Sequence, residues 1–272
     1  MISVPGAELH HTTAGQGPTC LFLCSSGVRP GEVQTPPALR DRLRMVYVDL
    51  RGSGSSTGNA ADLTFDVLAQ DLEAVRAHLG LERVAVLGHS VLGILAIEYG
   101  RRCPGTVSHV IAVGTPPSGD MGALQASANA FFAQDASEER KRILRENLAA
   151  LPPDAPPWVA MMAQSPMRFH DPRFDVAPLF AEAQLRPEML MHLFGTLTPR
   201  WDVTAGAGEL KVPTLLALGR HDYVVPHVLW EKIAPTLPAF TVQLFERSGH
   251  QPFFEEPEAF GAAVTDWMKR TA

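Results

Sequence analysis

Three polar residues stand where they could cooperate in nucleophilic catalysis, and Ser90 is the first. It lies in Val84–Gly93, VAVLGHSVLG, where an apolar run leads into small residues and then a second apolar run. This pattern predicts a buried strand, a tight turn and a helix, and a serine at such a turn is held in a strained conformation that exposes its hydroxyl. The N-terminus of the predicted helix would stabilise negative charge at the same place. Ser90 is therefore a candidate nucleophile.

A serine at a tight strand-to-helix turn is called a nucleophile elbow, and the sequence around Ser90 matches its usual pattern incompletely. The form G-x-S-x-G expects glycine at the fifth position, where this chain has Leu92, followed by Gly93. A serine before a helix could simply cap that helix. Because a serine hydroxyl is also a poor nucleophile without a base, the hypothesis requires a histidine and a carboxylate at the same edge of the sheet.

Asp222 and His250 meet that requirement. Asp222 follows an apolar run in Leu215–Pro226, LLALGRHDYVVP, and His250 lies in a glycine-containing loop within Phe245–Pro252, FERSGHQP. Taken alone, Asp222 could be a turn residue and His250 a surface histidine. Serine, aspartate and histidine in this order, each after a predicted parallel strand, indicate a catalytic triad.

Through Ser90, Asp222 and His250 the chain resembles an α/β-hydrolase. It resembles most of all the proline iminopeptidase-related branch of that fold. The other motifs that carry the resemblance are D-x-R-G-x-G-x-S at Asp49–Ser56, G-x-x-D at Gly219–Asp222 and G-H…E-x-P ending at Pro257. The resemblance implies a core formed by residues 1–113 and 212–272. It also implies a helical cap, residues 114–211, inserted after the sixth strand.

Hydrophobic periodicity supports an α/β fold with a mostly parallel central sheet and helices on both faces. Continuous apolar runs, typical of strands covered on both faces, alternate with helical patterns up to Val113 and again from Val212. The predicted strands are Cys20–Cys24, Met45–Val48, Val84–Leu87, Val107–Val113, Thr214–Leu218 and Thr241–Phe245, with an opening strand within Ile2–Thr12. The predicted helices are Phe65–Leu79, Ser90–Tyr99 and Pro257–Met268, with Leu124–Phe132 and Glu138–Leu151 in the insertion.

Two features of the resembled branch are missing. The segment Cys24–Val28, CSSGV, replaces the His-Gly-Gly-Pro-Gly loop that supplies part of the oxyanion hole. Since the hole needs backbone N–H groups rather than particular side chains, the amides of Ser26 and Val91 are the candidates, with Ser25 as a substitute. The acidic cap motif that holds a substrate's amino group is absent, which disfavours an aminopeptidase.

The insertion is expected to select the substrate. Methionine is flexible and fits irregular apolar groups, so the methionines of this segment are candidates for the lining of a pocket or for the core of the cap. They are Met121, Met161, Met162, Met167, Met189 and Met191.

Other polar groups are expected to carry no chemistry. Asp49 and Arg51 in their glycine-rich loop fit a structural clamp, and Cys24 fits a small buried hydrophobe rather than a nucleophile. The histidines lack metal-ligand spacing, and no dinucleotide or phosphate loop occurs. We therefore expect no metal and no cofactor.

Composition limits the partners and the location. The 272 residues carry a formal charge of −6, which disfavours nucleic acid as a partner. The best apolar stretch, Val84–Ile97, is shorter than the roughly 20 residues that a membrane-spanning helix needs. Three cysteines form no disulfide framework, and the N-terminus has no signal-peptide pattern. We expect a cytoplasmic protein with a small-molecule substrate, while its oligomeric state stays open.

The favoured function is hydrolysis of a carboxylic ester, or less readily an amide, of a small apolar substrate through an acyl-enzyme on Ser90. Three alternatives share the site. They are an aminopeptidase acting on N-terminal proline, a hydrolase-fold protein that binds a ligand with little turnover, and lyase-type chemistry on the same triad.

Overall fold

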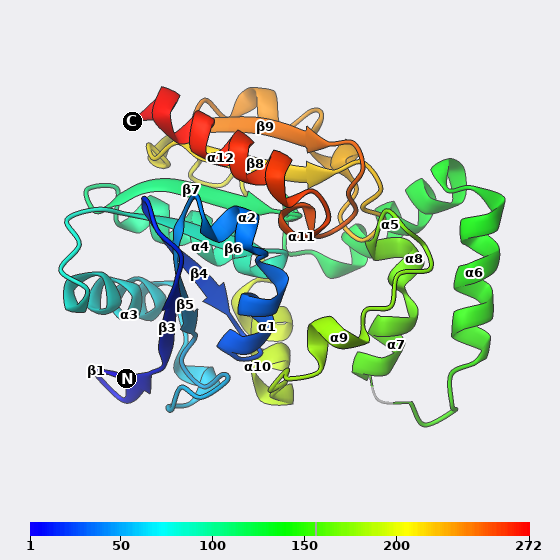
Figure 1. The fold of residues 1–272 in the computed structure, drawn as a ribbon, viewed down its shortest axis with the longest axis horizontal. Coiled ribbons are helices and arrows are strands. Elements are labelled where there is room, and N and C mark those ends of the chain that lie inside the picture. Colours follow the sequence, from blue (N-terminus) through cyan, green and yellow to red (C-terminus); the bar gives the residue numbers. More distant parts are fainter. Residues whose placement is uncertain (156) are drawn as a thin grey trace.

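A seven-stranded sheet lies at the centre of the computed structural model, which describes residues 1–155 and 157–272 (Figure 1). The strands are β1 (Ile2–Val4), β2 (Ala7–Leu9), β3 (His11–Ala14), β4 (Thr19–Cys24), β5 (Arg44–Asp49), β6 (Val84–His89), β7 (Val107–Val113), β8 (Thr214–Gly219) and β9 (Phe240–Phe245). The sheet order is β3-β5-β4-β6-β7-β8-β9, and β1 pairs with β2 in a separate hairpin. Only β3 is antiparallel to its neighbour in this sheet, so the predicted mostly parallel sheet is confirmed.

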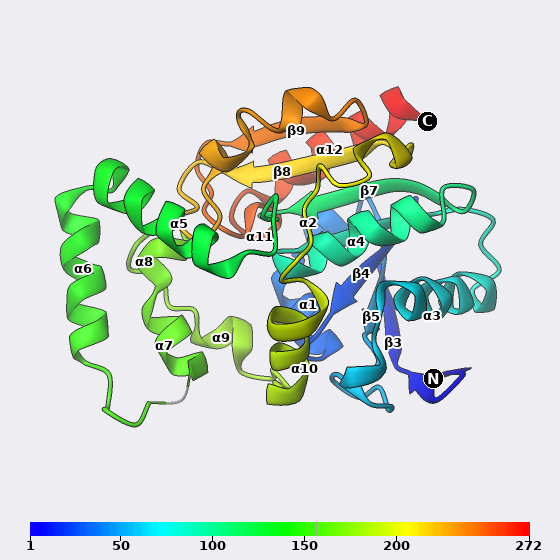
Figure 2. The ribbon, with the colours of Figure 1, turned by 180° about the vertical axis from the view of Figure 1, so that it is seen from behind.

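Helices cover both faces of the sheet, as the ribbon views from opposite sides show (Figures 1 and 2). Outside the insertion they are α1 (Val28–Gln34), α2 (Pro37–Arg40), α3 (Phe65–His78), α4 (Val91–Arg102), α11 (Pro252–Glu255) and α12 (Pro257–Thr271), with 3₁₀ turns at Ala60–Asp62, His227–Trp230 and Ala234–Thr236. None of the helices in the described ranges is long and apolar enough to cross a membrane.

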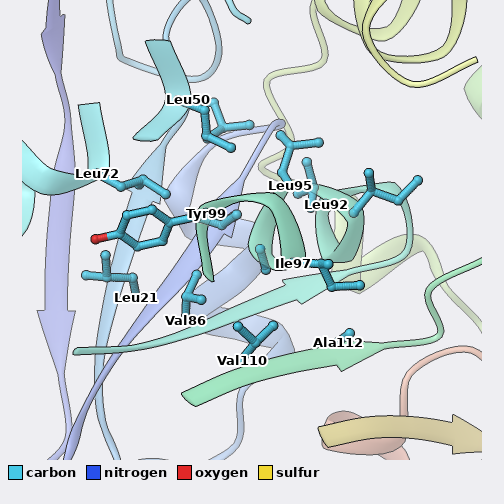
Figure 3. Close-up of a cluster of buried hydrophobic side chains, with 14 of the residues drawn as sticks. Leu21, Leu50, Leu72, Val86, Leu92, Leu95, Ile97, Tyr99, Val110 and Ala112 are labelled. Atoms are coloured by element: carbon cyan, nitrogen blue, oxygen red, sulfur yellow. The ribbon is translucent and has the colours of Figure 1, made fainter. Parts of the chain in front are cut away.

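The central strands are buried because their side chains alternate between two hydrophobic cores. In β4, Leu21 and Leu23 enter the core beneath α3 and α4, whereas Cys20 and Phe22 enter the core that contains Trp267 of α12. Figure 3 shows part of the first core. Because both faces are covered, the strands are apolar at nearly every position, which is the pattern that made them predictable.

Local signals fix the ends of the predicted helices. The Thr64 side chain accepts a hydrogen bond from the Val67 amide at 3.1 Å and so begins α3. Gly80 follows the helix with φ +66°, a conformation that glycine adopts without strain. The helices α4 and α12 also match their predicted ranges to within three residues. The short helices α1 and α2 were not predicted.

The segment 114–211, here called the insertion, lies between β7 and β8. Its helices are α5 (Met121–Asp135), α6 (Glu138–Ala149), α7 (Pro157–Ala163), α8 (Ser165–Arg168), α9 (Ala177–Phe180) and α10 (Pro187–His192), with a π-helical turn at Leu193–Leu197 and a 3₁₀ turn at Ala207–Glu209. The Gly119 amide donates to the Trp201 carbonyl at 2.8 Å, so the first and last parts of the insertion are hydrogen-bonded to each other. The helix α9 contacts α1, and α10 contacts the turn Ala60–Asp62.

A buried ion pair ties α3 to the loop after β5, and it gives the first prediction. Arg51 donates to both carboxylate oxygens of Asp71, at 3.0 and 2.7 Å, and both side chains are almost fully buried. Removing Asp71 leaves the guanidinium buried and unpaired. We expect Asp71→Ala to lower the free energy of unfolding by about 3–5 kcal/mol, measured by urea denaturation.

The matched control for Asp71 is Asp66 on the same helix. Asp66 accepts a hydrogen bond from Arg102, but its side chain is 78% exposed. An exposed pair contributes about 0–1 kcal/mol, so Asp66→Ala should change stability little. Equal losses in the two variants would contradict the role given to burial.

Candidate active site

Ser90 lies at the sharp turn between β6 and α4. Its backbone has φ 57° and ψ −129°, and among the described residues it is the one non-glycine residue with positive φ. The turn is held by the Ser90 amide, which donates to the Val113 carbonyl at 2.8 Å. Although Ser90 is the N-cap residue of α4, its side chain caps no backbone amide. The capping alternative is therefore wrong, and the hydroxyl remains available.

The departure from G-x-S-x-G at Leu92 has a structural reason. The Leu92 side chain is buried in the core beneath α4, where Figure 3 shows it near Leu95. The positions that exclude a side chain are instead Gly88 and Gly93. A Cβ on Gly88 would lie 2.1 Å from the Leu92 carbonyl oxygen, and one on Gly93 would lie 1.8 Å from Thr115 Oγ1. The second required glycine has thus moved one residue along the helix.

Asp222 and His250 are hydrogen-bonded to each other. His250 Nδ1 lies 2.7 Å from Asp222 Oδ2, and the two side chains are 2% and 0% exposed. The other carboxylate oxygen, Oδ1, accepts hydrogen bonds from the amides of Val224 and Val225 at 2.9 and 2.8 Å. Asp222 therefore organises its own turn and also fixes the orientation of the imidazole.

The loops that carry Asp222 and His250 pack backbone against backbone. A Cβ on Gly219 would lie 1.8 Å from the Gly249 carbonyl oxygen, which explains the glycine of the G-x-x-D motif. The His221 amide donates to the Ser248 carbonyl at 2.9 Å. Glycine at position 219 permits the two loops to approach, whereas glycine at position 249 permits the backbone at Arg168 to approach the His250 loop.

Two glutamates of the closing motif anchor the His250 loop. Glu255 accepts hydrogen bonds from the Gly249 amide at 2.8 Å and from the His170 amide of the insertion at 2.7 Å. Burial raises the pKa of Glu255 to about 7. Glu256 accepts from the Ser248 hydroxyl at 2.6 Å. The motif E-x-P therefore positions His250 rather than acting on a substrate.

His89, which the sequence reasoning did not single out, also positions His250. Its Nε2 donates to the His250 carbonyl at 2.8 Å, and the two ring centroids are 4.6 Å apart. Burial lowers the pKa of His89 well below its usual value, so the ring is neutral and no charge opposes a proton on His250. The signal available in the sequence was its place beside Ser90.

Ser90 and His250 both line a cavity of about 220 Å³. His250 Nδ1 is engaged by Asp222, which leaves Nε2 as the nitrogen that can receive a proton. Within the described ranges, no hydrogen bond joins the Ser90 hydroxyl to His250, and contacts of this kind commonly tighten when substrate binds. The other walls come from the segment after β4, the start of α4 and the insertion.

The insertion contributes mainly leucine and phenylalanine to this cavity. In the described cavity lining, Met161 is the one methionine among the six candidates of the insertion, and the alternative of packing within the insertion applies to others of them. Met167 and Met189 are buried within hydrophobic clusters, while Met121 and Met191 are exposed. The apolar insertion residues of the wall are Met161, Phe180, Leu185, Leu190, Leu193 and Phe194.

The segment after β4, which is predicted to contribute to the oxyanion hole, lines the cavity. Ser25, Ser26 and Val91 all line the cavity, and Val91 is the first residue of α4, whose amide has no partner within the helix. The Ser26 carbonyl accepts a hydrogen bond from the Gln184 amide at 2.7 Å, which fixes the loop against the insertion. The assignment of the hole to Ser26 and Val91 remains a prediction.

Cys24 is buried and also lines the cavity. Burial raises the pKa of the Cys24 thiol well above its usual value, and the nearby Asp49 raises it further. A thiol that resists ionisation is a weak nucleophile. Cys24 therefore shapes the floor of the cavity, in agreement with the prediction of a small buried hydrophobe.

The loop after β5 has a structural role, but Asp49 and Arg51 do not pair with each other. Asp49 contacts His10 Nδ1 at 3.1 Å and accepts from the Ser55 amide at 2.9 Å, whereas Arg51 pairs with Asp71. No cluster of His, Cys, Asp and Glu side chains in the described ranges could hold a metal ion.

The sheet, the elbow at Ser90 and the Asp222–His250 pair together define an α/β-hydrolase. The match to a protein-family model agrees: residues 10–257 match the alpha/beta hydrolase fold family, to which the chain therefore belongs. As a member of this family the chain is an enzyme, a hydrolase. The expected fold is thus confirmed.

Similar proteins include esterases and other hydrolases. The chain is 30% identical to the AB hydrolase superfamily protein YclE of Bacillus subtilis, over 97% of this chain and 96% of that protein. It is 27% identical to the pimeloyl-[acyl-carrier protein] methyl ester esterase of Nitrosomonas europaea, over 93% and 97% of the two chains. The crystal structure of a proline iminopeptidase from Mycobacterium smegmatis matches with a TM-score of 0.75 and 22% identity, over 99% and 97% of the chains. The proline iminopeptidase branch is therefore one of several neighbours.

Proposed function

We propose that the protein is a serine hydrolase that cleaves a carboxylic ester of a small, largely apolar substrate through an acyl-enzyme on Ser90. The observation that carries this proposal is the buried Asp222–His250 hydrogen bond beside a cavity that Ser90 also lines. The similarity to a methyl ester esterase supports an ester as the substrate. The insertion would act as the cap that selects it.

The reaction follows from the geometry of these groups. The Ser90 oxygen attacks the ester carbonyl carbon, and its proton passes to Nε2 of His250. Asp222 holds Nδ1–H and stabilises the imidazolium. The amides of Ser26 and Val91 would hold the oxyanion. The bond to the alcohol then breaks as His250 returns the proton to the alcohol, and water repeats the sequence to release the acid and restore Ser90.

The cavity wall argues against an aminopeptidase. Its described lining includes no aspartate or glutamate that could hold a substrate's ammonium group, and it includes a cationic side chain, Arg168. A cation in the wall would repel that ammonium group. An ester or a simple amide is compatible with the same wall.

A fluorophosphonate probe tests the proposal against a binding protein without turnover. The probe should form a covalent adduct that mass spectrometry places on Ser90, and p-nitrophenyl esters should be hydrolysed faster than prolyl p-nitroanilide. Prior treatment with the probe should remove the esterase activity. A folded protein that forms no adduct and turns over no ester would refute the proposal.

A further inference from the structure

Two residues that line the cavity beside Ser90 each carry a buried polar atom without a hydrogen-bond partner in the described ranges. The two atoms are Nε of Arg168 and Oε1 of Gln251. Buried donors and acceptors nearly always have a partner, because leaving one unpaired is costly. Unpaired groups in the wall of a candidate active site therefore indicate where a polar part of a substrate binds.

Arg168 is half-buried, and its partners differ from those of Arg51 and Arg140, two buried arginines of the chain. Arg51 is neutralised by the carboxylate of Asp71. Arg140, in the same insertion, donates to the carbonyls of Pro166 and Phe169 at 2.6 and 2.8 Å. In the described part of the chain, the Arg168 guanidinium forms no ion pair with a carboxylate and donates no hydrogen bond to a backbone carbonyl.

The backbone fixes Arg168 next to His250. The Arg168 carbonyl accepts a hydrogen bond from the His250 amide at 2.6 Å, and a Cβ on Gly249 would lie 2.1 Å from that carbonyl oxygen. Burial lowers the pKa of the guanidinium, and the charge of Asp222 opposes this shift. Because arginine is not deprotonated in proteins, a fixed positive charge results at the site.

We propose that Arg168 binds a carboxylate of the substrate, so that the preferred substrates are small esters that also bear a free carboxylate. A guanidinium matches a carboxylate in charge and in its paired hydrogen bonds. The cavity holds about 220 Å³ and no carboxylate of its own in its described lining, so a short monoanion suits it. The inference rests on the proposed function, since it names the substrate class of the same site.

Two substrate pairs test the inference in the wild-type enzyme. Mono-p-nitrophenyl glutarate carries its carboxylate on the acyl side and is compared with its neutral methyl ester. The compound 3-acetoxybenzoate carries its carboxylate on the leaving group and is compared with its own methyl ester. A higher kcat/KM for the charged member of at least one pair is expected. Preference for the neutral member of both pairs would overturn the inference.

Variants assign the preference to Arg168. Arg168→Gln should lower kcat/KM for the preferred charged ester by about 10–100-fold, since a hydrogen bond to a charged group is lost, and change the neutral ester by less than about twofold. Arg168→Lys should recover part of the loss. Arg173→Gln is the matched control, because Arg173 is an exposed arginine of the insertion paired with Glu139. Equal losses on charged and neutral esters would overturn the inference.

A binding measurement separates this inference from the proposed function. In the Ser90→Ala background, monomethyl glutarate should bind more tightly than dimethyl glutarate by calorimetry, and adding Arg168→Gln should remove the difference. Ester turnover without any carboxylate preference would overturn the role of Arg168 and leave the proposed function standing. No turnover and no adduct on Ser90 would refute the proposed function. Calorimetry would then still show whether Arg168 binds a carboxylate.

Discussion

Replacing Ser90 by alanine should lower kcat for p-nitrophenyl ester hydrolysis by about four to six orders of magnitude. Loss of the hydroxyl removes the nucleophile, and His250 and Asp222 then have no group to activate. The strained turn should persist, because it is held by the amide of residue 90 and the carbonyl of Val113 rather than by the serine side chain. Single-turnover and steady-state rates, with circular dichroism to verify folding, measure the effect.

The matched control is Ser127→Ala on α5, outside the described cavity lining. This variant should keep kcat within about twofold of the wild type, because Ser127 is only partly buried and the substitution is small and away from the site. Retention of more than a tenth of the activity in Ser90→Ala would show that another group attacks the ester.

Much of the fold could be predicted because the central strands are buried on both faces. The run Val107–Val113 is apolar at five of its seven positions, and the structure places β7 over the same residues. The N-terminal region was harder: a single opening strand was expected within Ile2–Thr12, but Gly6 turns the chain and three short strands form. A strand of three residues is too short to show a period.

Helix α1, which was not predicted, depends on packing between segments that are distant in the sequence. The helix α1 contains Pro30 and Gly31, which have low helix propensity. It forms because Gly31 packs closely on the sheet, where an added Cβ would lie 3.1 Å from the Tyr47 ring. The tertiary contact therefore overrides the local preference.

The candidate site shows the same division between local and distant signals. Ser90, Asp222 and His250 each follow a strand, so the edge of the sheet at which they meet was predictable. Arg168 ends a four-residue helix and reaches the site only through its contact with the His250 loop. No periodic pattern marks such a residue, and only its place in the cavity reveals it.

Replacing Asp222 by asparagine should lower kcat by about 10³–10⁴-fold while leaving the fold intact. Oδ1 of residue 222 accepts two backbone N–H groups, from Val224 and Val225, and the asparagine carbonyl oxygen must take that place. The amide NH₂ then faces Nδ1 of His250. Because this nitrogen must now accept a hydrogen bond, the imidazole proton moves to Nε2, and Nε2 can no longer take the proton of Ser90.

The control for Asp222 is Asp202→Asn, which keeps the same kind of local contact away from the site. Asp202 Oδ1 accepts from the Thr204 amide at 2.8 Å, and the residue is exposed. Esterase kinetics and thermal melting are measured for both variants. Wild-type kcat in Asp222→Asn would contradict the orienting role, whereas a large drop with an unchanged melting temperature would support it, because loss of the fold would then be excluded as the cause.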